Sequence, residues 1–380
     1  MRVAVVDPQA YTPPYDDEFC RSLAAAGAEV ELLTAHFTHG TAPEPHGYVR
    51  REIFGPPLAG LIARRPSSRA RIPLKAAGHA TGLARLVRRV RSWHPDIVHW
   101  QWAPQPSLDL RALRAARHES GATIFTAHDV LPRRSRDAAP LWAELYASCD
   151  RVIVHGAASR DRLLVEVGGV TPERIAVIPH ALLHAVEGGV VPPETAEPRM
   201  LFFGQIRPDK GLDVLIEALP AVARAVPEVT LDVVGSPRMP MEALRARAEE
   251  LGVAGRISWD LRFVPESEVP AVMARARVVA LPYRWIEGSG VLATALARGV
   301  PPVVTAVGTF PELCADYDLG APVPPDDPAA LARALVTALT DPAARSRAAA
   351  GMARARAELT WERTAQMTLE LYEKALAART

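Results

Sequence analysis

The chain has 380 residues, of which 49% are hydrophobic and 23% charged, and its formal net charge at pH 7 is +1. This length predicts two domains rather than one core, and the near-neutral charge argues against nucleic acid as a partner. Three widely spaced cysteines provide neither a disulfide framework nor a metal-ligand cluster. The sequence contains no signal-peptide pattern and no long apolar run, so we expect a cytoplasmic protein.

The N-terminal segment predicts a β-α-β unit. Residues 2–7 form an apolar strand, a proline-rich loop follows, and residues 18–26 have the pattern of a helix. Because the loop has no G-x-G-x-x-G sequence, we do not expect a nicotinamide cofactor. Three side chains of the loop, Tyr11, Tyr15 and Asp16, could line a ligand pocket, and the alternative is a solvated loop.

The segment from Arg64 to Arg91 is strongly basic. It contains nine Lys and Arg residues and no acidic residue, and apolar residues are interspersed among them. The pattern predicts a partly helical, amphipathic segment. Such a helix either packs its apolar stripe on a sheet while the arginine head groups stay in water, or makes a weak contact with an anionic membrane surface. We favour the first interpretation.

Two later apolar runs end in polar and aromatic residues. Residues 96–100 and 123–127 are predicted strands, and residues 109–119 between them have a helical pattern. Because ligands collect beyond the carboxyl ends of parallel strands, the side chains at these ends should project into one crevice. These side chains are His99, Trp100, Trp102, His128 and Asp129.

Residues 187–199 are rich in Gly, Pro and Glu, which is typical of a linker between domains. Strand and helix patterns alternate on both sides of this linker, which predicts two doubly wound parallel sheets facing a cleft. We therefore expect one domain over residues 1–190, a second over residues 191–360, and a final helix over residues 361–380.

Two cations precede a predicted helix in the second half. The strand pattern at residues 200–203 is followed by GQIRPDKG, and the next residues have the apolar spacing of a helix. Arg207 and Lys210 lie in this glycine-bounded turn. Two cations at a helix start can stabilise a leaving diphosphate. The alternative is a helix start with its lysine in solvent.

Residues 281–312 read as strand, glycine loop, helix, strand and second glycine loop. Gly288 and Gly290 bracket a turn from which a helix begins, so backbone N–H groups and the positive end of the helix dipole point at an anion. A nucleoside diphosphate fits this position. Glu287 at the mouth of the loop could accept hydrogen bonds from the hydroxyls of an attached sugar, or it could only complement the helix N-terminus.

These motifs resemble the donor-binding signatures of family 4 retaining glycosyltransferases. Glu287 matches the first of two glutamates that the family places eight positions apart, and Ala295 occupies the second position. Lys210 matches the lysine of the family's Gly-Arg-x-x-x-x-Lys-Gly, but Gln205 replaces its arginine, so we carry the arginine role to Arg207. The runs HWQW and AHDVLP are also similar to strand ends in this family.

The resemblance implies a GT-B fold and a reaction that moves a sugar from a UDP- or GDP-type nucleotide sugar to an acceptor hydroxyl, with retention and without a metal. It assigns catalytic roles to His128, Arg207, Lys210 and Glu287. It implies a donor site that includes Gly204, Arg262, Gly288, Ser289, Gly290 and Val291. On the acceptor side the candidates are Tyr11, Tyr15, Asp16, Trp102 and Asp129.

Two other functions remain open on this fold. One is a sugar-nucleotide epimerase or phosphorylase, which needs different groups at the sugar. The other is a non-catalytic partner subunit, which Gln205 and Ala295 favour and the presence of Arg207, Lys210 and Glu287 disfavours. A glycan, a lipid-linked or cell-wall precursor and a small natural product all fit as acceptors.

Overall fold

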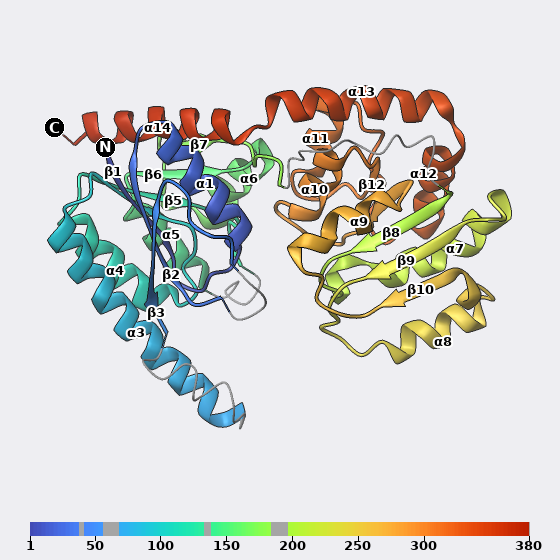
Figure 1. Ribbon diagram of the computed structural model, residues 1–380, viewed down its shortest axis with the longest axis horizontal. Helices are drawn as coiled ribbons and strands as arrows, with labels where there is room; N and C mark the ends of the chain where they lie inside the picture. Colours follow the sequence, from blue (N-terminus) through green and yellow to red (C-terminus); the bar gives the residue numbers. More distant parts are fainter. Residues whose placement is uncertain (38–41, 56–67, 133–137, 184–196, 380) are drawn as a thin grey trace. The chain divides into compact units, whose positions relative to one another are not determined.

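The computed structural model describes residues 1–37, 42–55, 68–132, 138–183 and 197–379 (Figure 1). It separates into two compact units, one of Met1–Pro179 with Trp361–Thr380 and the other of His180–Thr360. The division falls after Pro179 rather than at residue 190. Most of the predicted linker, from residue 187 to 196, lies outside the described residues.

The first unit is built on a parallel sheet with the strand order β3-β2-β1-β4-β5-β6-β7. Its strands are β1 (Arg2–Asp7), β2 (Glu29–Ala35), β3 (Val49–Phe54), β4 (Ile97–Trp100), β5 (Ala122–Thr126), β6 (Arg151–Val154) and β7 (Ile175–Val177). Its helices are α1 (Pro13–Ala25), α3 (Ser68–Trp93), α4 (Pro106–Arg117), α5 (Ala139–Ala147), α6 (Ala157–Arg162) and α14 (Trp361–Ala377). Short turns of π-helix (Leu163–Val167) and 3-10 helix (Pro172–Arg174) precede β7.

Two features of this unit differ from the sequence prediction. Helix α1 begins at Pro13, so Tyr15 and Asp16 lie in its first turns and not in a loop. Two prolines at the start explain this, because the first turn of a helix needs no N–H donor. Strand β3 (VRREIF) gave no strand signal, since it lies at the sheet edge and most of its side chains are exposed or half-buried.

His99 and Trp100 do not project into a crevice as expected. Both are fully buried within β4. The two ring nitrogens of His99 lie 2.5 Å from the Tyr372 hydroxyl of α14 and 2.7 Å from the Thr126 hydroxyl. Burial lowers the pKa of His99 to about 3, so this ring is a neutral link between the sheet and the last helix.

The second unit has a parallel sheet with the order β10-β9-β8-β11-β12. Its strands are β8 (Arg199–Phe203), β9 (Thr230–Val234), β10 (Ile257–Asp260), β11 (Val278–Leu281) and β12 (Pro302–Val304). Its helices are α7 (Leu212–Ala225), α8 (Glu242–Glu250), α9 (Val269–Ala274), α10 (Gly290–Arg298), α11 (Phe310–Tyr317), α12 (Pro328–Thr340) and α13 (Pro342–Glu358). Single 3-10 turns lie at Pro208–Lys210, Ala254–Arg256 and Glu266–Glu268.

Helices cover both faces of this second sheet. Met200 and Phe202 of β8 pack into one apolar cluster with α7, α8 and α12, whereas Leu201 packs into another with α9, α10, α11 and α13. Alternate residues of a strand point to opposite faces, so a strand buried on both sides must be apolar throughout. The sheet order and this layering confirm the predicted fold class of two doubly wound α/β sheets.

The basic segment is described only from Ser68, and its side chains only from residue 77. In that part Arg85 donates to the Ile53 carbonyl, Arg89 pairs with Glu31, and Arg91 pairs with Glu119. These arginines are therefore engaged within the first unit. Among the described residues, no helix combines the length and the apolar character needed to cross a membrane.

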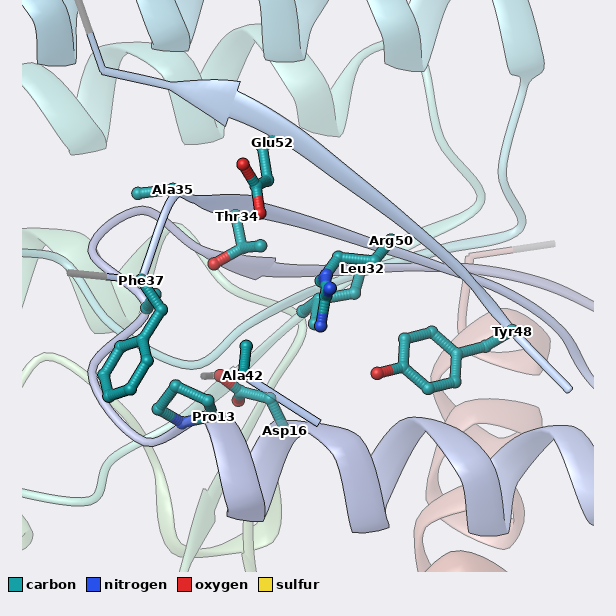
Figure 2. A pocket seen from close by; sticks show the side chains of 11 residues that line it. Pro13, Asp16, Leu32, Thr34, Ala35, Phe37, Ala42, Tyr48, Arg50 and Glu52 are labelled. Carbon is teal, nitrogen blue, oxygen red and sulfur yellow. The ribbon is translucent and has the colours of Figure 1, made fainter. Parts of the chain in front are cut away.

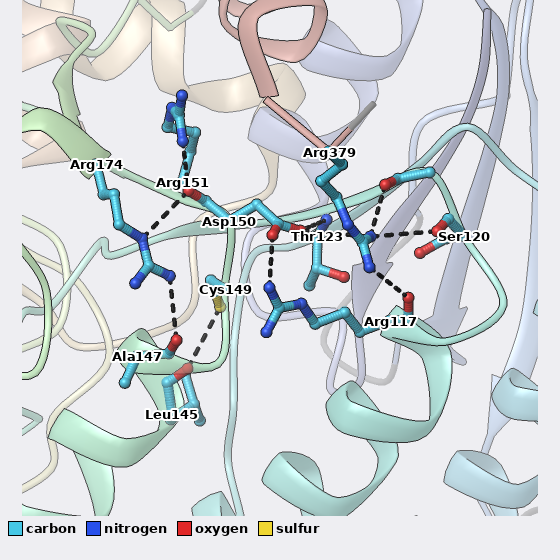
Figure 3. Close-up of polar contacts among 11 residues, drawn as sticks. Arg117, Ser120, Thr123, Leu145, Ala147, Cys149, Asp150, Arg151, Arg174 and Arg379 are labelled. Atoms are coloured by element: carbon cyan, nitrogen blue, oxygen red, sulfur yellow. Dashed lines mark hydrogen bonds and ion pairs between the residues drawn. The ribbon is translucent and has the colours of Figure 1, made fainter. Parts of the chain in front are cut away.

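The last residues of the chain join a buried polar network around Asp150 (Figure 3). The Asp150 carboxylate accepts from the Thr123 backbone N–H and from Arg117, each at 2.8 Å, and lies 3.6 Å from Arg379. Arg379 also donates to the Gly121 carbonyl at 2.6 Å. Asp150 is 8% exposed, so its charge is balanced by these donors and not by water.

Replacing Asp150 by alanine should destabilise the first unit by about 2–3 kcal/mol, because a buried N–H and a partly buried arginine lose their acceptor. Chemical unfolding of the full chain measures this. Asp161→Ala is the matched control, since Asp161 is exposed and, among the described residues, forms an ion pair with neighbouring Arg160. It should change stability by no more than about 0.5 kcal/mol. Equal effects of the two substitutions would contradict the structural role of Asp150.

Candidate functional site

Three loops at the carboxyl end of the second sheet pack closely against one another. Gly211 begins α7 with a φ of +67°, and a Cβ there would lie 1.9 Å from the Pro282 carbonyl oxygen after β11. A Cβ on Gly308, after β12, would lie 2.2 Å from the Ile286 carbonyl oxygen. Only glycine permits both the backbone angle and the approach. These contacts fix the positions of the loops that carry the predicted donor residues.

The first of these loops holds two cations in place. Arg207 precedes a single 3-10 turn, Pro208–Lys210, and its Nη2 donates to Asp209 at 3.0 Å. The Arg207 Nε–H is sealed from solvent and has no acceptor among the described residues. The Lys210 ammonium lies 3.7 Å from the centre of the Tyr283 ring, an arrangement favourable to a cation. The structure therefore orients both charges.

Arg284 stabilises the same region and was missed by sequence reasoning. Its guanidinium contacts both oxygens of Asp213 at 2.6–2.8 Å, Asp326 at 2.6 Å and the Pro208 carbonyl at 2.6 Å. Burial alone would raise the pKa of Asp213, but the bonds to Arg284 lower it below its usual value. No motif signals this arginine, because its acidic partners are 71 and 42 residues away in the sequence.

Helix α10 begins as an anion-binding helix would. The Ser289 hydroxyl caps it by accepting from the Leu292 N–H at 3.3 Å, and the Tyr283 hydroxyl hydrogen-bonds to the same side chain. The N–H groups of Gly290 and Val291 precede the first helical acceptor and point out of the helix end. A Cβ on Gly204, after β8, would lie 3.2 Å from Val291, so the two predicted donor loops are neighbours.

Glu287 is 3% exposed, immediately before this helix. Its backbone carbonyl accepts from the Thr309 N–H at 3.0 Å, which ties the second glycine loop to the first. Ala295, at the family's second glutamate position, is fully buried in the core of the second unit. Arg262, a predicted donor contact, pairs with Asp260 at 2.9 Å and with Glu268, so two carboxylates already bind its guanidinium.

The predicted residues of the first unit form an aromatic stack. The rings of Tyr11 and Trp102 lie 4.7 Å apart, and Trp102 stacks on His128, also at 4.7 Å. Tyr15 meets His128 edge-on at 4.8 Å. Tyr15 is buried, whereas Tyr11 is 61% exposed, so Tyr11 presents the open face of the stack. Asp129 follows His128 and is half-buried.

A chain of hydrogen bonds sets the orientation of His128. His155 Nδ1 lies 3.0 Å from the Ile178 carbonyl oxygen, and His155 Nε2 lies 3.1 Å from His128 Nδ1. A carbonyl only accepts, so His155 donates from Nδ1 and accepts from His128 Nδ1–H through Nε2. His128 Nε2 then faces the Gln101 side chain at 2.9 Å.

The Gln101 amide nitrogen is buried without a partner among the described residues. If the oxygen and nitrogen of the Gln101 amide exchange places, the nitrogen donates to Nε2 of a neutral His128. The amide nitrogen and the ring nitrogen then each have a partner. His155 was missed by sequence reasoning. The feature that could have identified it is its position at the end of β6, which is equivalent to the position of His128 at the end of β5.

Asp16 is buried beside Asp7, which ends β1. Asp7 accepts from the backbone N–H groups of Gln9 at 3.1 Å and Tyr11 at 2.6 Å, so it orders the loop that carries Tyr11. Burial, followed by the charge of Asp7, raises the pKa of Asp16 well above its usual value. Burial also raises the pKa of Asp7, so both carboxyl groups are costly to charge where they lie.

Within the described residues, no three His, Cys, Asp or Glu side chains are arranged as a metal-ligand set. The two units therefore offer different chemistry. The second presents fixed cations and a helix N-terminus, and the first presents an aromatic stack with an oriented histidine.

Sequence comparison matches both units to glycosyltransferases. Residues 17–182 match the family described as Glycosyltransferase Family 4, and residues 197–341 match Glycosyl transferases group 1. A phosphatidyl-myo-inositol mannosyltransferase from Mycobacterium leprae is 30% identical over 98% of this chain and 96% of its own length. A D-inositol 3-phosphate glycosyltransferase from Nocardioides sp. is 28% identical over 96% of this chain and 85% of its own length.

Solved structures with the same fold cover essentially the whole chain. Sucrose-phosphate synthase from Thermosynechococcus elongatus has a TM-score of 0.77 and 20% identity over 100% of both chains. HepE from Anabaena, in complex with UDP-glucose, has a TM-score of 0.72 and 17% identity over 98% of this chain and 100% of its own. With the two family matches and the 30% identity over nearly full length, the chain belongs to glycosyltransferase family 4.

Proposed function

We propose that this glycosyltransferase binds a UDP- or GDP-type nucleotide sugar in its second unit and transfers the sugar with retention, without a metal ion. The observation that carries the proposal is the convergence of Arg207, Lys210 and the N-terminus of α10 at one edge of the sheet. A diphosphate needs cations and directed N–H donors, and these loops supply both.

The Arg207 Nε–H supports a phosphate contact. A buried donor without an acceptor costs about 1–3 kcal/mol, and a phosphate oxygen would remove that cost. The names of related proteins point the same way, since HepE was solved with UDP-glucose. We place the sugar at Glu287, whose carboxylate would accept bonds from sugar hydroxyls next to the diphosphate.

In the proposed reaction the bond between the anomeric carbon and the leaving diphosphate breaks, and the acceptor oxygen bonds to the same face of that carbon. The leaving phosphate oxygen takes the acceptor proton. Negative charge then grows on the diphosphate, where Arg207 and Lys210 would stabilise it most in the transition state. These two cations provide the charge that a divalent ion provides in other transferases.

The acceptor would approach through the first unit, with Tyr11 and Trp102 as an apolar platform and His128 as the oriented polar group. The inositol compounds named in the relatives make a hydroxyl on a ring a reasonable acceptor class. We propose that the reaction takes place in the cytoplasm. Any membrane contact would be confined to the basic segment Arg64 to Arg91.

Removal of the Lys210 charge should abolish most nucleotide binding. We expect one nucleoside diphosphate or nucleotide sugar from a panel to stabilise the wild type by about 2.7 kcal/mol at a hundredfold excess over Kd. Lys210→Met keeps about the same side-chain length without the charge, and it should weaken nucleotide binding by about tenfold or more. Thermal unfolding with each ligand measures the effect.

Lys374→Met is the matched control, because Lys374 is exposed on α14 in the first unit. If the nucleotide stabilises the Lys210→Met variant as strongly as it stabilises the wild type and the control, the proposed diphosphate position is wrong. If no nucleotide stabilises the wild type, the non-catalytic interpretation suggested by Ala295 and Gln205 takes precedence.

The stereochemistry of the product tests the retaining mechanism. An α-linked donor should give an α-linked product, visible in the anomeric proton coupling of the first product formed, and a chelator should leave the rate unchanged. A β-linked product would exclude retention. Conversion of the donor without any acceptor would instead favour an epimerase or phosphorylase.

A further inference from the structure

One arginine outside the predicted donor residues holds the turn that carries the two cations. Arg284 directly follows Tyr283 in the loop between β11 and α10. Its backbone N–H donates to the Asp209 carbonyl at 2.9 Å, and its Nη1 donates to the Pro208 carbonyl at 2.6 Å. One residue therefore binds two of the three carbonyl groups in the Pro208–Lys210 turn.

This turn depends on support from outside. It is a single turn of 3-10 helix, closed by bonds of 3.0 Å from the Lys210 N–H and 3.4 Å from the Gly211 N–H. The hydrogen bonds of a 3-10 turn are poorly aligned, so one such turn holds its shape weakly by itself. The Asp209 carboxylate within it binds Arg207, and Lys210 lies on the Tyr283 ring. A shift of the turn would therefore move both cations.

Two carboxylates fix the guanidinium of Arg284 in turn. Its Nη1 and Nη2 contact the two oxygens of Asp213 at 2.8 and 2.6 Å, and its Nε contacts Asp326 at 2.6 Å. Asp213 lies in the first turn of α7, and Asp326 lies shortly before α12. A planar guanidinium can make all these bonds and still reach the Pro208 carbonyl, whereas an ammonium group cannot.

We propose that Arg284 is a positioning residue of the donor site, and that it holds the Pro208–Lys210 turn where Arg207 and Lys210 meet the second phosphate of a nucleoside diphosphate. This inference rests on the proposed donor site and adds to it a residue that does not touch the nucleotide. Asp213 and Asp326 already balance the charge of Arg284. Its contribution is therefore the geometry of the turn and not a third cation for the phosphate.

The hollow between α1, β2 and β3 in the first unit offers no competing place for a phosphate (Figure 2). Asp16, Thr34 and Arg50 are among the residues that line it. It has room for about one water molecule. Nucleotide probes will therefore not bind in this hollow.

Calorimetric titration of the full chain with UMP, UDP, GMP and GDP tests the role of Arg284. The measured quantity is the diphosphate preference, which is the Kd of the monophosphate divided by the Kd of the diphosphate with the same base. Arg284→Met should lower this preference about five- to twentyfold, because displaced cations lose charge-assisted bonds to the second phosphate. The Kd of the monophosphate should not change. A general loss of structure would instead raise both dissociation constants together.

Arg284→Lys separates geometry from charge, and it carries the test if the methionine variant does not fold. Lysine keeps a positive charge beside Asp213 and Asp326 but lacks the planar fork that binds them together with the Pro208 carbonyl. We expect its diphosphate preference to stay at least about threefold below that of the wild type. Full recovery of the preference by lysine would assign the effect to charge and overturn the positioning role.

Arg247→Met is the matched control in the same unit. Arg247 lies on α8 and also binds a carboxylate of α7, Glu217 at 2.6 Å, and a second carboxylate, Glu250 at 2.9 Å. Its replacement removes the same charge and a bond to the same helix, but neither of these two bonds involves the Pro208–Lys210 turn. The diphosphate preference of this variant should equal that of the wild type.

Two results would overturn the inference and leave the donor site in place. One is a wild-type preference in both Arg284 variants when Lys210→Met has lost it. The other is an equal loss in Arg284→Met and Arg247→Met, because any arginine bound to α7 would then have the effect. If the wild type binds no nucleoside diphosphate, or binds it no better than the monophosphate, the donor site and the role of Arg284 are both wrong.

Discussion

The close backbone contact between Gly211 and the Pro282 carbonyl underlies the arrangement of the second unit's site. Any side chain at residue 211 would collide with this oxygen, and the backbone angle there also favours glycine. The contact sets the cation-bearing loop against the end of β11, where Lys210 reaches the Tyr283 ring. Tyr283 in turn bonds to Ser289, the cap of α10. One backbone contact therefore connects the cations to the helix N-terminus.

In the first unit, buried polar groups hold the candidate site residues in position. Asp7 orders the loop of Tyr11 through two backbone N–H groups, and His155 fixes the ring of His128. Such groups hold a single geometry, because each alternative would leave a polar atom unpaired in a medium of low dielectric. The stack of Tyr11, Trp102 and His128 is therefore supported from behind, while its outer ring is exposed.

Much of the fold was predictable because parallel strands buried on both faces are short apolar runs, and both sheets consist of them. The edge strand β3 was missed because its exposed charges hide that pattern. For the candidate site, motifs with local spacing pointed to Lys210 and Glu287, and the roles of both residues stay predictions. Arg284 had no such signal, since its acidic partners come from distant parts of the sequence.

The sequence by itself determined the family, the α/β class and the loops that carry the candidate donor residues. These properties depend on local patterns: apolar strands, glycine turns and the residues next to them. Only the tertiary structure decided that His99 is a buried link to Tyr372, that Asp16 is buried beside Asp7, and that Arg262 is already paired. The physical reason is that burial and pairing depend on residues brought together from remote positions, and these decide whether a polar side chain is structural or available to a ligand.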